Sequence, residues 1–293
     1  MKKRTFSVWT LMQAVRDRVI MHPAVLRLML PFGHCLNPDR WIFVIGSYNA
    51  GTTLLAGILR NHPLIGGLHT EGSFLTDVLP YPERYGWPRM WSQCFDDIRI
   101  SAQPEEQWRA ERIKKHWSIW FPKDKPNLVE KSVANAARIP FLNTFFRPAY
   151  FLYIVRNGYA VAKGIQRKAN VRRWNSPYKD KGYPIEMCAG QWKATDDVVE
   201  ACKSRIANLL TITYEDLTHD CARTLARITG FLGLPEIPRE VWQKKWSIHE
   251  SRSPIRNMNP PALGALTTYE IEAIERQAAQ TLRKYGYDRP DKP

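Results

Sequence analysis

Short apolar runs alternate along this chain with stretches in which apolar residues recur at helical spacing. Four runs have the length and composition of buried strands in a parallel sheet: residues 41–45, 127–130, 150–155 and 209–214. Five stretches have the spacing of amphipathic helices: residues 54–59, 134–146, 159–167, 187–206 and 221–232. This alternation predicts a three-layer α/β fold in which helices flank a central parallel sheet, with ligands bound at the carboxyl ends of the strands.

Residues 80–121 interrupt the alternation and are rich in tryptophan among charged residues. The tryptophans are Trp87, Trp91, Trp108, Trp117 and Trp120. Indole rings contribute large contact areas both to ligand sites and to protein cores. We expect this stretch to be a helical cap inserted over the acceptor pocket. The alternative, a helical satellite that only stabilises the fold, fits most of these tryptophans at least as well.

The chain divides into a basic amphipathic segment at residues 1–40 and one domain at residues 41–293. The segment carries seven Lys or Arg and two Asp among apolar residues. This pattern is typical of a helix lying on an anionic membrane surface, and equally of a helix packed on the domain. Because Arg16, Asp17 and Arg18 break the apolar stretch, we expect it to make a poor signal peptide and to be unable to span a bilayer. We expect a cytoplasmic protein, with peripheral association with the inner face of a membrane as the further expectation.

The chain is strongly basic, with a formal net charge of +15 and a pI near 9.7. This charge predicts a polyanionic partner: nucleic acid, anionic lipid, an acidic glycan or a multiply charged cofactor. No helix-turn-helix, zinc or aromatic RNA-binding signature is present, so we expect no nucleic-acid partner. The five cysteines form no C-x-x-C pair, which argues against a disulfide framework and against a zinc site.

A phosphate-loop skeleton, GSYNAGTT at residues 46–53, follows directly after the apolar run at 41–45. Nucleotide kinases with the G-x-x-x-x-G-K-[ST] motif use its lysine to neutralise the β- and γ-phosphates, and this chain has Thr52 there. A metal-dependent P-loop kinase is therefore disfavoured. The backbone N–H groups of such a loop, with a helix beginning near Thr52, suit a nucleotide 5′-phosphate without requiring a metal. The sequence thus predicts a P-loop-type fold.

Polar motifs follow each of the four predicted strands. The loop at 46–53 follows the first, EKS at 130–132 the second, RNG at 156–158 the third and YEDL at 214–217 the fourth. Because the carboxyl ends of parallel strands meet at one edge of a sheet, we expect these motifs to converge. A phosphate loop alone is a weak signal, but this ordered combination is a strong one.

With these motifs in this order, the chain resembles the PAPS-dependent sulfotransferases, whose donor is 3′-phosphoadenosine 5′-phosphosulfate. FVIGSYNAGTTLLAGILRNHPLI is similar to the family's 5′-phosphosulfate loop and helix, LVEKS to a strand-end segment of several branches, and YFLYIVRNGYAVAKG to the 3′-phosphate motif. ITYEDL and FLGLP resemble the later motifs, and PIRNMNPPALGALT resembles the basic loop that closes over the donor in Golgi-type and tyrosylprotein members.

The resemblance implies transfer of a sulfuryl group from PAPS to a hydroxyl, for which we expect a carbohydrate or glycolipid acceptor. The 5′-phosphosulfate would be held by Asn49, Ala50, Gly51, Thr52 and Thr53. By the same resemblance Arg156 would bind the 3′-phosphate, Tyr214 would contact the adenine and Arg256 would lie in the closing loop. No metal is implied.

The chain departs from the family pattern at two positions. The family usually has lysine or arginine where this chain has Asn49, and serine where it has Gly164. The resemblance suggests Lys131 as the replacement for the missing cation near the transferred group, and Lys163 as a further cation at the 3′-phosphate. The alternative is a catalytically degenerate scaffold that binds PAPS or its product at a membrane without turnover.

A base for the acceptor hydroxyl is expected in the segment after His62, where the tyrosylprotein branch carries its catalytic glutamate. Glu71 is the first candidate and His69 the second. The alternative is that Glu71 caps a helix beginning near Gly72. The carboxylates of Glu130, Glu215 and Asp216 are expected to be structural.

The basic run at 163–181, with seven Lys or Arg and one Asp, could receive an acidic acceptor or could be a solvated face. Within this run, Trp174 and Tyr178 are expected either to stack on a sugar ring or to pack.

Overall fold

Five parallel strands form the central sheet, in the order β2-β3-β1-β4-β5. The computed structural model describes residues 22–248 and 251–291. The strands are β1 (Arg40–Gly46), β2 (Ile65–Gly67), β3 (Asn127–Glu130), β4 (Ala149–Val155) and β5 (Leu209–Thr213). The four predicted strands are confirmed. The sequence reasoning missed β2, because it has three residues, of which two are glycines.

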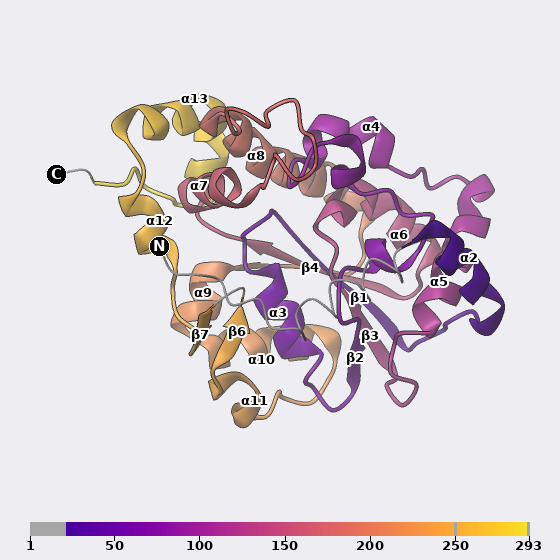
Figure 1. The fold of residues 1–293 in the computed structure, drawn as a ribbon. Helices are drawn as coiled ribbons and strands as arrows, with labels where there is room; N and C mark the ends of the chain where they lie inside the picture. Colours follow the sequence, from indigo (N-terminus) through magenta and orange to yellow (C-terminus); the bar gives the residue numbers. More distant parts are fainter. Residues whose placement is uncertain (1–21, 249–250, 292–293) are drawn as a thin grey trace.

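Helices cover both faces of the sheet and give the predicted three layers (Figure 1). One face is covered by α3 (Thr52–Leu59), α9 (Tyr214–His219), α10 (Cys221–Leu232) and α11 (Arg239–Gln243). The other is covered by α5 (Gln107–Ser118), α6 (Ile139–Phe145), α7 (Gly158–Lys168), α8 (Ile185–Cys202) and α13 (Thr268–Lys284).

The central strand β1 is buried on both faces, as its continuous apolar run predicts. Trp41, Phe43 and Ile45 face the α5–α8 layer, while Ile42 and Val44 face the α3 layer. This alternation is the two-residue period of a strand. The strand therefore anchors both cores, and it delivers the phosphate loop at its carboxyl end.

Three predicted elements have clearly different bounds. The helix expected at 187–206 is α8, which ends at Cys202, followed by a 3₁₀-helix, Lys203–Arg205. The single helix expected at 134–146 is a 3₁₀-helix, Val133–Arg138, followed by α6. Pro140 lies in the first turn of α6, and since proline has no N–H to donate to the preceding turn, it begins a new helix. The strand expected at 209–214 ends at Thr213, whose side chain accepts a hydrogen bond from the Asp216 N–H and so caps α9.

Residues 80–121 are helical, as predicted. They contain α4 (Phe95–Ile98), α5 and three 3₁₀ turns, Pro82–Tyr85, Trp91–Cys94 and Pro104–Glu106. The side chains of Trp91 and Trp117 are buried in the core, whereas Trp108 is 52% exposed. Trp87 and Trp120 are partly buried and pack against the core. Four of the five tryptophans, all but Trp108, therefore stabilise the cap and its junction with the domain, which is the alternative that the sequence left open.

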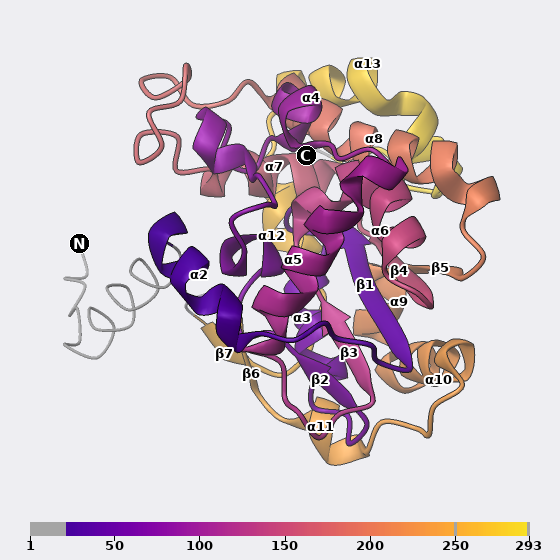
Figure 2. The same ribbon diagram turned by 90° about the vertical axis from the view of Figure 1, so that its right-hand side faces the viewer.

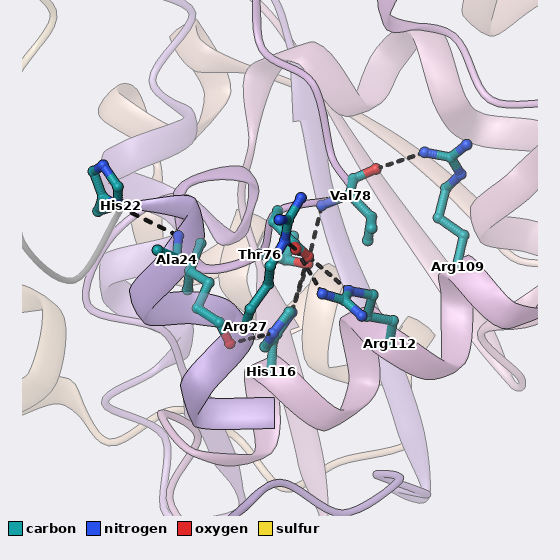
Figure 3. A network of polar contacts seen from close by, with 10 residues as sticks. His22, Ala24, Arg27, Thr76, Val78, Arg109, Arg112 and His116 are labelled. Atoms are coloured by element: carbon teal, nitrogen blue, oxygen red, sulfur yellow. Dashed lines mark hydrogen bonds and ion pairs between the residues drawn. The ribbon is translucent and has the colours of Figure 1, made fainter. Parts of the chain in front are cut away.

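The N-terminal helix α2 (Pro23–Met29) packs on α5 through a polar network (Figure 3). The buried His116 ring makes hydrogen bonds to the Leu26 carbonyl and the Thr76 hydroxyl, both at 2.9 Å. Asp77 accepts two hydrogen bonds from Arg112, at 2.8 and 2.6 Å. A 3₁₀ turn, Leu30–Phe32, follows α2. Residues 1–21, more than half of the predicted amphipathic segment, lie outside the described residues.

The C-terminal part wraps around the strand ends (Figures 1 and 2). The strands β6 (Trp246–Ile248) and β7 (Ser251–Ser253) pair antiparallel, and α12 (Asn259–Gly264) leads to α13. Short 3₁₀-helices at Gly72–Leu75 and Lys203–Arg205 complete the described elements. In the described parts of the chain, none of the helices is long and apolar enough to cross a membrane.

Candidate active site

The phosphate loop joins β1 to α3, which begins at Thr52 as predicted. Gly51 has a φ of +99°, and a Cβ there would lie 2.7 Å from the Tyr214 ring, so only glycine fits. Asn49 also has a left-handed backbone, with a φ of +64°, a conformation that asparagine tolerates better than most residues. The loop therefore turns back over the strand ends and directs α3 away from them.

A cavity of about 900 Å³ opens beside this loop at the carboxyl ends of the strands. The predicted residues that line it are Asn49, Gly51, Thr52, Thr53, His69, Glu71, Lys131, Arg156, Gly164, Tyr214 and Arg256. They come from the ends of β1, β3, β4 and β5, from the segment after β2, from α7 and from the C-terminal loop. The expected convergence of the four motifs is thus observed.

Two predicted residues do not line the cavity. Ala50 is buried, and its N–H donates to the Ser47 carbonyl at 3.1 Å inside the loop. Lys163 forms an ion pair with Glu270 of α13 at 2.5 Å. The structure therefore corrects the expected placement of both residues. From the same helix α7, Arg167 and Lys168 line the cavity instead.

The two residues expected to carry the chemistry are directly paired. Glu71 Oε1 lies 2.6 Å from Lys131 Nζ. Glu71 makes no capping hydrogen bond to the 3₁₀-helix that follows it, so the capping alternative is not observed. His69 also lines the cavity, with its ring 5.6 Å from the Trp120 ring. The Glu71–Lys131 pair therefore links the segment after β2 to the end of β3.

Glu130 fixes the backbone and side chains next to the Glu71–Lys131 pair. Its buried carboxylate accepts hydrogen bonds from the Gly72 N–H at 2.8 Å and from the Asn135 amide at 2.6 Å, and from the Ser132 hydroxyl. Burial raises the pKa of Glu130 to about 7. The bond to Gly72 fixes the backbone next to Glu71, which agrees with the structural role expected for Glu130.

Arg156 binds the phosphate loop as well as facing the cavity. Its Nη1 donates to the Asn49 carbonyl and its Nε to Asn259 Oδ1, both at 2.7 Å. Its guanidinium lies 4.2 Å from the centroid of the Tyr214 ring. Burial lowers the pKa of Arg156 from that of a free arginine. Arg156 therefore holds the loop, the Tyr214 ring and the C-terminal segment in one arrangement.

Tyr214 and Glu215 connect the strand end to the C-terminal segment. The Tyr214 hydroxyl donates to the Arg256 carbonyl and accepts from the Met258 N–H, both at 3.1 Å. Glu215 accepts hydrogen bonds from the Asn259 amide and the Asn157 N–H, and from Tyr287. These contacts agree with the structural role expected for Glu215, and they place Arg256 beside the cavity.

The cavity is strongly cationic. Of the residues that the structure describes, seven Lys or Arg and two Glu line it. Burial lowers the pKa of Lys168, and the positive charges of Arg89, Arg156 and Arg167 lower it further. Such a cluster of like charges favours an anionic ligand. Within the described ranges, no group of His, Cys, Asp and Glu is placed to hold a metal.

Sequence reasoning missed two cavity residues of the cap, Glu83 and Arg89. Burial raises the pKa of Glu83 to about 7, and the charge of Glu71 acts in the same direction. Arg89 Nη1 lies 3.5 Å from Asn49 Oδ1. No motif surrounds either residue, so the sequence offered no signal beyond the expectation that the cap covers the pocket.

Asn49 and Gly164, the two residues that depart from the family pattern, lie next to each other in the structure. A Cβ on Gly164 would come within 3.1 Å of Asn49 Cγ and 3.2 Å of Asn49 Cβ. The Asn49 Nδ2 group is buried and has no hydrogen-bond partner among the described residues. Gly164 therefore leaves room for the Asn49 side chain, and Asn49 keeps one donor unsatisfied in the protein.

Comparison with known protein families shows to which family this chain belongs. The model described as "Sulfotransferase family" matches residues 41–238. The chain belongs to the sulfotransferase family. A Caenorhabditis briggsae protein, provisionally named a protein-tyrosine sulfotransferase, is 26% identical over 209 residues, which are 68% of this chain and 67% of the relative.

Solved structures show the same fold. Sulfotransferase STF9 from Mycobacterium avium superposes with a TM-score of 0.57 at 15% identity, covering 99% of this chain and 89% of its own. The sulfotransferase domain from the curacin biosynthetic pathway has a TM-score of 0.50 at 18% identity, covering 85% of this chain and 98% of its own. The predicted P-loop-type α/β fold, with its parallel sheet and helical cap, is confirmed.

Proposed function

We propose that this sulfotransferase takes its sulfuryl group from PAPS, transfers it to a hydroxyl and releases adenosine 3′,5′-bisphosphate (PAP). The observation that carries the proposal is that the phosphate loop, Arg156 and the Glu71–Lys131 pair meet in one cationic cavity. PAPS is a nucleotide with several negative charges, and a cavity lined by seven cationic side chains suits such a ligand.

The donor would lie with its 5′-phosphosulfate against Gly51, Thr52 and Thr53, where the N-terminus of α3 favours an anion. The buried, unpartnered Asn49 Nδ2 offers a hydrogen bond to the same group. Arg156 would bind the 3′-phosphate, and Tyr214, held by the Arg256 and Met258 backbones, would contact the adenine.

The reaction asks for a base on the acceptor and for cations on the leaving group. The acceptor oxygen forms a bond to sulfur while the bond from sulfur to the bridging oxygen breaks, and that electron pair stays on the 5′-phosphate of PAP. Glu71 takes the acceptor proton. Lys131 bonds to Glu71 before the donor binds, and it stabilises the charge that develops near the sulfuryl group.

The proposed acceptor is a hydroxyl of a carbohydrate or glycolipid that carries acidic groups. Arg167 and Lys168 supply positive charge at the side of the cavity. Within the basic run that contains them, Tyr178 packs against Trp87 and Tyr183, which favours a structural role for Tyr178. A tyrosine hydroxyl is the second candidate acceptor, because the Caenorhabditis briggsae relative is named for that activity.

The proposed location is the cytoplasmic face of a membrane. Leu28 of α2 is 74% exposed and Phe32, just after α2, is 83% exposed, and both lie within the basic N-terminal segment. Exposed apolar groups next to basic residues suit an anionic bilayer surface. Sedimentation with vesicles containing anionic lipid, compared for the full chain and a Leu28→Ser/Phe32→Ser variant, tests this location.

Calorimetric titration without metal tests the donor. We expect micromolar affinity for PAP, weaker affinity for adenosine 5′-phosphate and no preference for ATP. Binding that requires ATP and Mg²⁺ would restore the kinase alternative.

A second experiment tests turnover and the acceptor. Labelled PAPS is offered with acidic glycans and with tyrosine peptides. Tight PAP binding with no sulfation and no PAPS hydrolysis would support the degenerate scaffold instead.

A further inference from the structure

Arg89 comes from the cap, far along the chain from the phosphate loop, yet its guanidinium lies over that loop. Arg89 Nη1 is 3.5 Å from Asn49 Oδ1, and the guanidinium carbon is 5.9 Å from the centroid of the Tyr48 ring. Both Tyr48 and Asn49 line the cavity beside it. The cap thus brings a positive charge to the loop position at which this chain has a neutral side chain.

The backbone holds Arg89 in an unfavourable conformation to do this. Arg89 has a φ of +61°, which is uncommon for a residue with a side chain. Its neighbours Pro88 and Met90 are buried, so the turn is anchored on both sides. Residues in such conformations persist only where the surrounding structure stabilises them, and they are concentrated at functional sites. The anchored turn therefore directs the Arg89 side chain into the cavity.

The charge of Arg89 is available to a ligand. No ion pair joins its guanidinium to another residue in the described part of the chain, unlike Lys131 and Lys163. Glu83 of the cap receives a hydrogen bond from the Arg89 backbone, and the charge of Arg89 acts to lower the pKa of Glu83. The neighbouring cations Arg156, Arg167 and Lys168 increase the positive potential around it. An anionic group entering this part of the cavity would be attracted to Arg89.

We propose, resting on the PAPS-dependent function above, that Arg89 supplies the cation that the loop lacks at Asn49. Its guanidinium would contact the sulfuryl group and the bridging oxygen of the donor. As the bond from sulfur to that oxygen breaks, the oxygen keeps the electron pair, and Arg89 stabilises the charge. Gly164 belongs to the same arrangement, because it leaves Asn49 the room to lie beneath the guanidinium.

One charge-removing and one charge-retaining substitution test Arg89. The variants are Arg89→Gln, Arg89→Lys and, as the matched control, Arg84→Gln, which removes an exposed arginine of the same cap. The affinities for PAPS and PAP are measured by calorimetry, and PAPS hydrolysis to PAP is measured without acceptor, so that no acceptor needs to be known. Thermal unfolding of each variant checks that it is folded.

We expect Arg89→Gln to retain PAP binding, to lower the PAPS-to-PAP affinity ratio by about tenfold and to slow hydrolysis by about 100-fold, while Arg89→Lys retains most of both. Arg84→Gln should match the wild type. An unchanged ratio and rate in Arg89→Gln would overturn the proposal. So would an equal loss of PAP and PAPS affinity, which would mean that Arg89 only supports the loop. A wild-type protein that binds neither nucleotide would instead overturn the proposed donor.

Discussion

The Glu71 carboxylate and the Lys131 ammonium lie 2.6 Å apart, and they join the segment after β2 to the end of the neighbouring strand β3. An anionic donor that engages Lys131 competes with Glu71 for the same ammonium group. We therefore expect donor binding to loosen this pair and to leave the Glu71 carboxylate open to the acceptor hydroxyl.

Glu71→Gln should lower turnover by roughly 100- to 10,000-fold, because it removes the base while keeping the shape of the side chain. PAP affinity should not fall, since Lys131 becomes free to bind phosphate. Initial rates with labelled PAPS and calorimetry with PAP measure the two effects. Glu272→Gln on the outer side of α13 is the matched control. Unchanged turnover in Glu71→Gln would move the role of base to His69.

Arg156→Ala should weaken PAP by about 100-fold and adenosine 5′-phosphate by about tenfold, since charged hydrogen bonds are worth about 1.5–3 kcal/mol. Arg156 also holds the Asn49 carbonyl, so some loss for both nucleotides is expected. Parallel calorimetric titrations give the ratio of the two losses. Equal losses would show that Arg156 supports the loop and does not read the 3′-phosphate.

The contact between Gly164 and Asn49 predicts that substitutions at the two positions are not additive. Gly164→Ser should leave PAP affinity unchanged or reduced, because the new side chain would crowd Asn49. In an Asn49→Gly background, whose residue 49 suits the left-handed backbone, the same serine should raise PAP affinity severalfold. The coupling energy from the four proteins should be about 1 kcal/mol. Additive effects would mean that the two positions are independent.

The fold and much of the site follow from local sequence signals. The phosphate loop, Lys131, Arg156 and Tyr214 lie at or directly after the ends of predicted strands, and parallel strands bring their carboxyl ends together. Helix α13 could have been found, since Thr267 and Glu270 form a capping box ahead of apolar residues at helical spacing.

Other features depend on tertiary structure. Lys163 has Glu270 as a partner only because α13 packs on α7. Arg89 reaches the loop only because a turn between buried residues directs it there. Neither contact has a periodicity or motif that a single sequence reveals. Residues contributed by the cap are thus the part of the site that sequence reasoning finds least well.

Glu83 predicts a pH dependence of donor binding. Burial raises its pKa to about 7, so the carboxyl is neutral below that pH and ionised above it. Ionisation adds a negative charge to the cavity, which should lower PAP affinity as the pH rises through 7. In Glu83→Gln this component should be absent, while the titration of the PAP phosphates remains. Calorimetry at pH 6 to 8 on both proteins measures the difference, and parallel profiles would exclude Glu83 as its cause.

His116 predicts a loss of stability in acid. Its Nε2–H donates to the Leu26 carbonyl, so Nδ1 is unprotonated and accepts from the Thr76 hydroxyl. Burial lowers the pKa of His116 below 6.5, and although Asp77 opposes this shift, the charge of Arg112 adds to it. The folded state therefore prefers neutral His116. The stabilisation is complete above pH 6.5 and is lost as the pH falls through that value.

Urea unfolding at pH 7.5 and 5.5 measures this effect. The wild type should lose more unfolding free energy between the two values than His116→Gln, which retains a donor and an acceptor but does not titrate. Replacement of the exposed His219 by glutamine is the control, and it should behave like the wild type. Because His116 joins α2 to α5, an equal pH dependence in His116→Gln and the wild type would mean that the acid sensitivity of the fold arises elsewhere than at this junction.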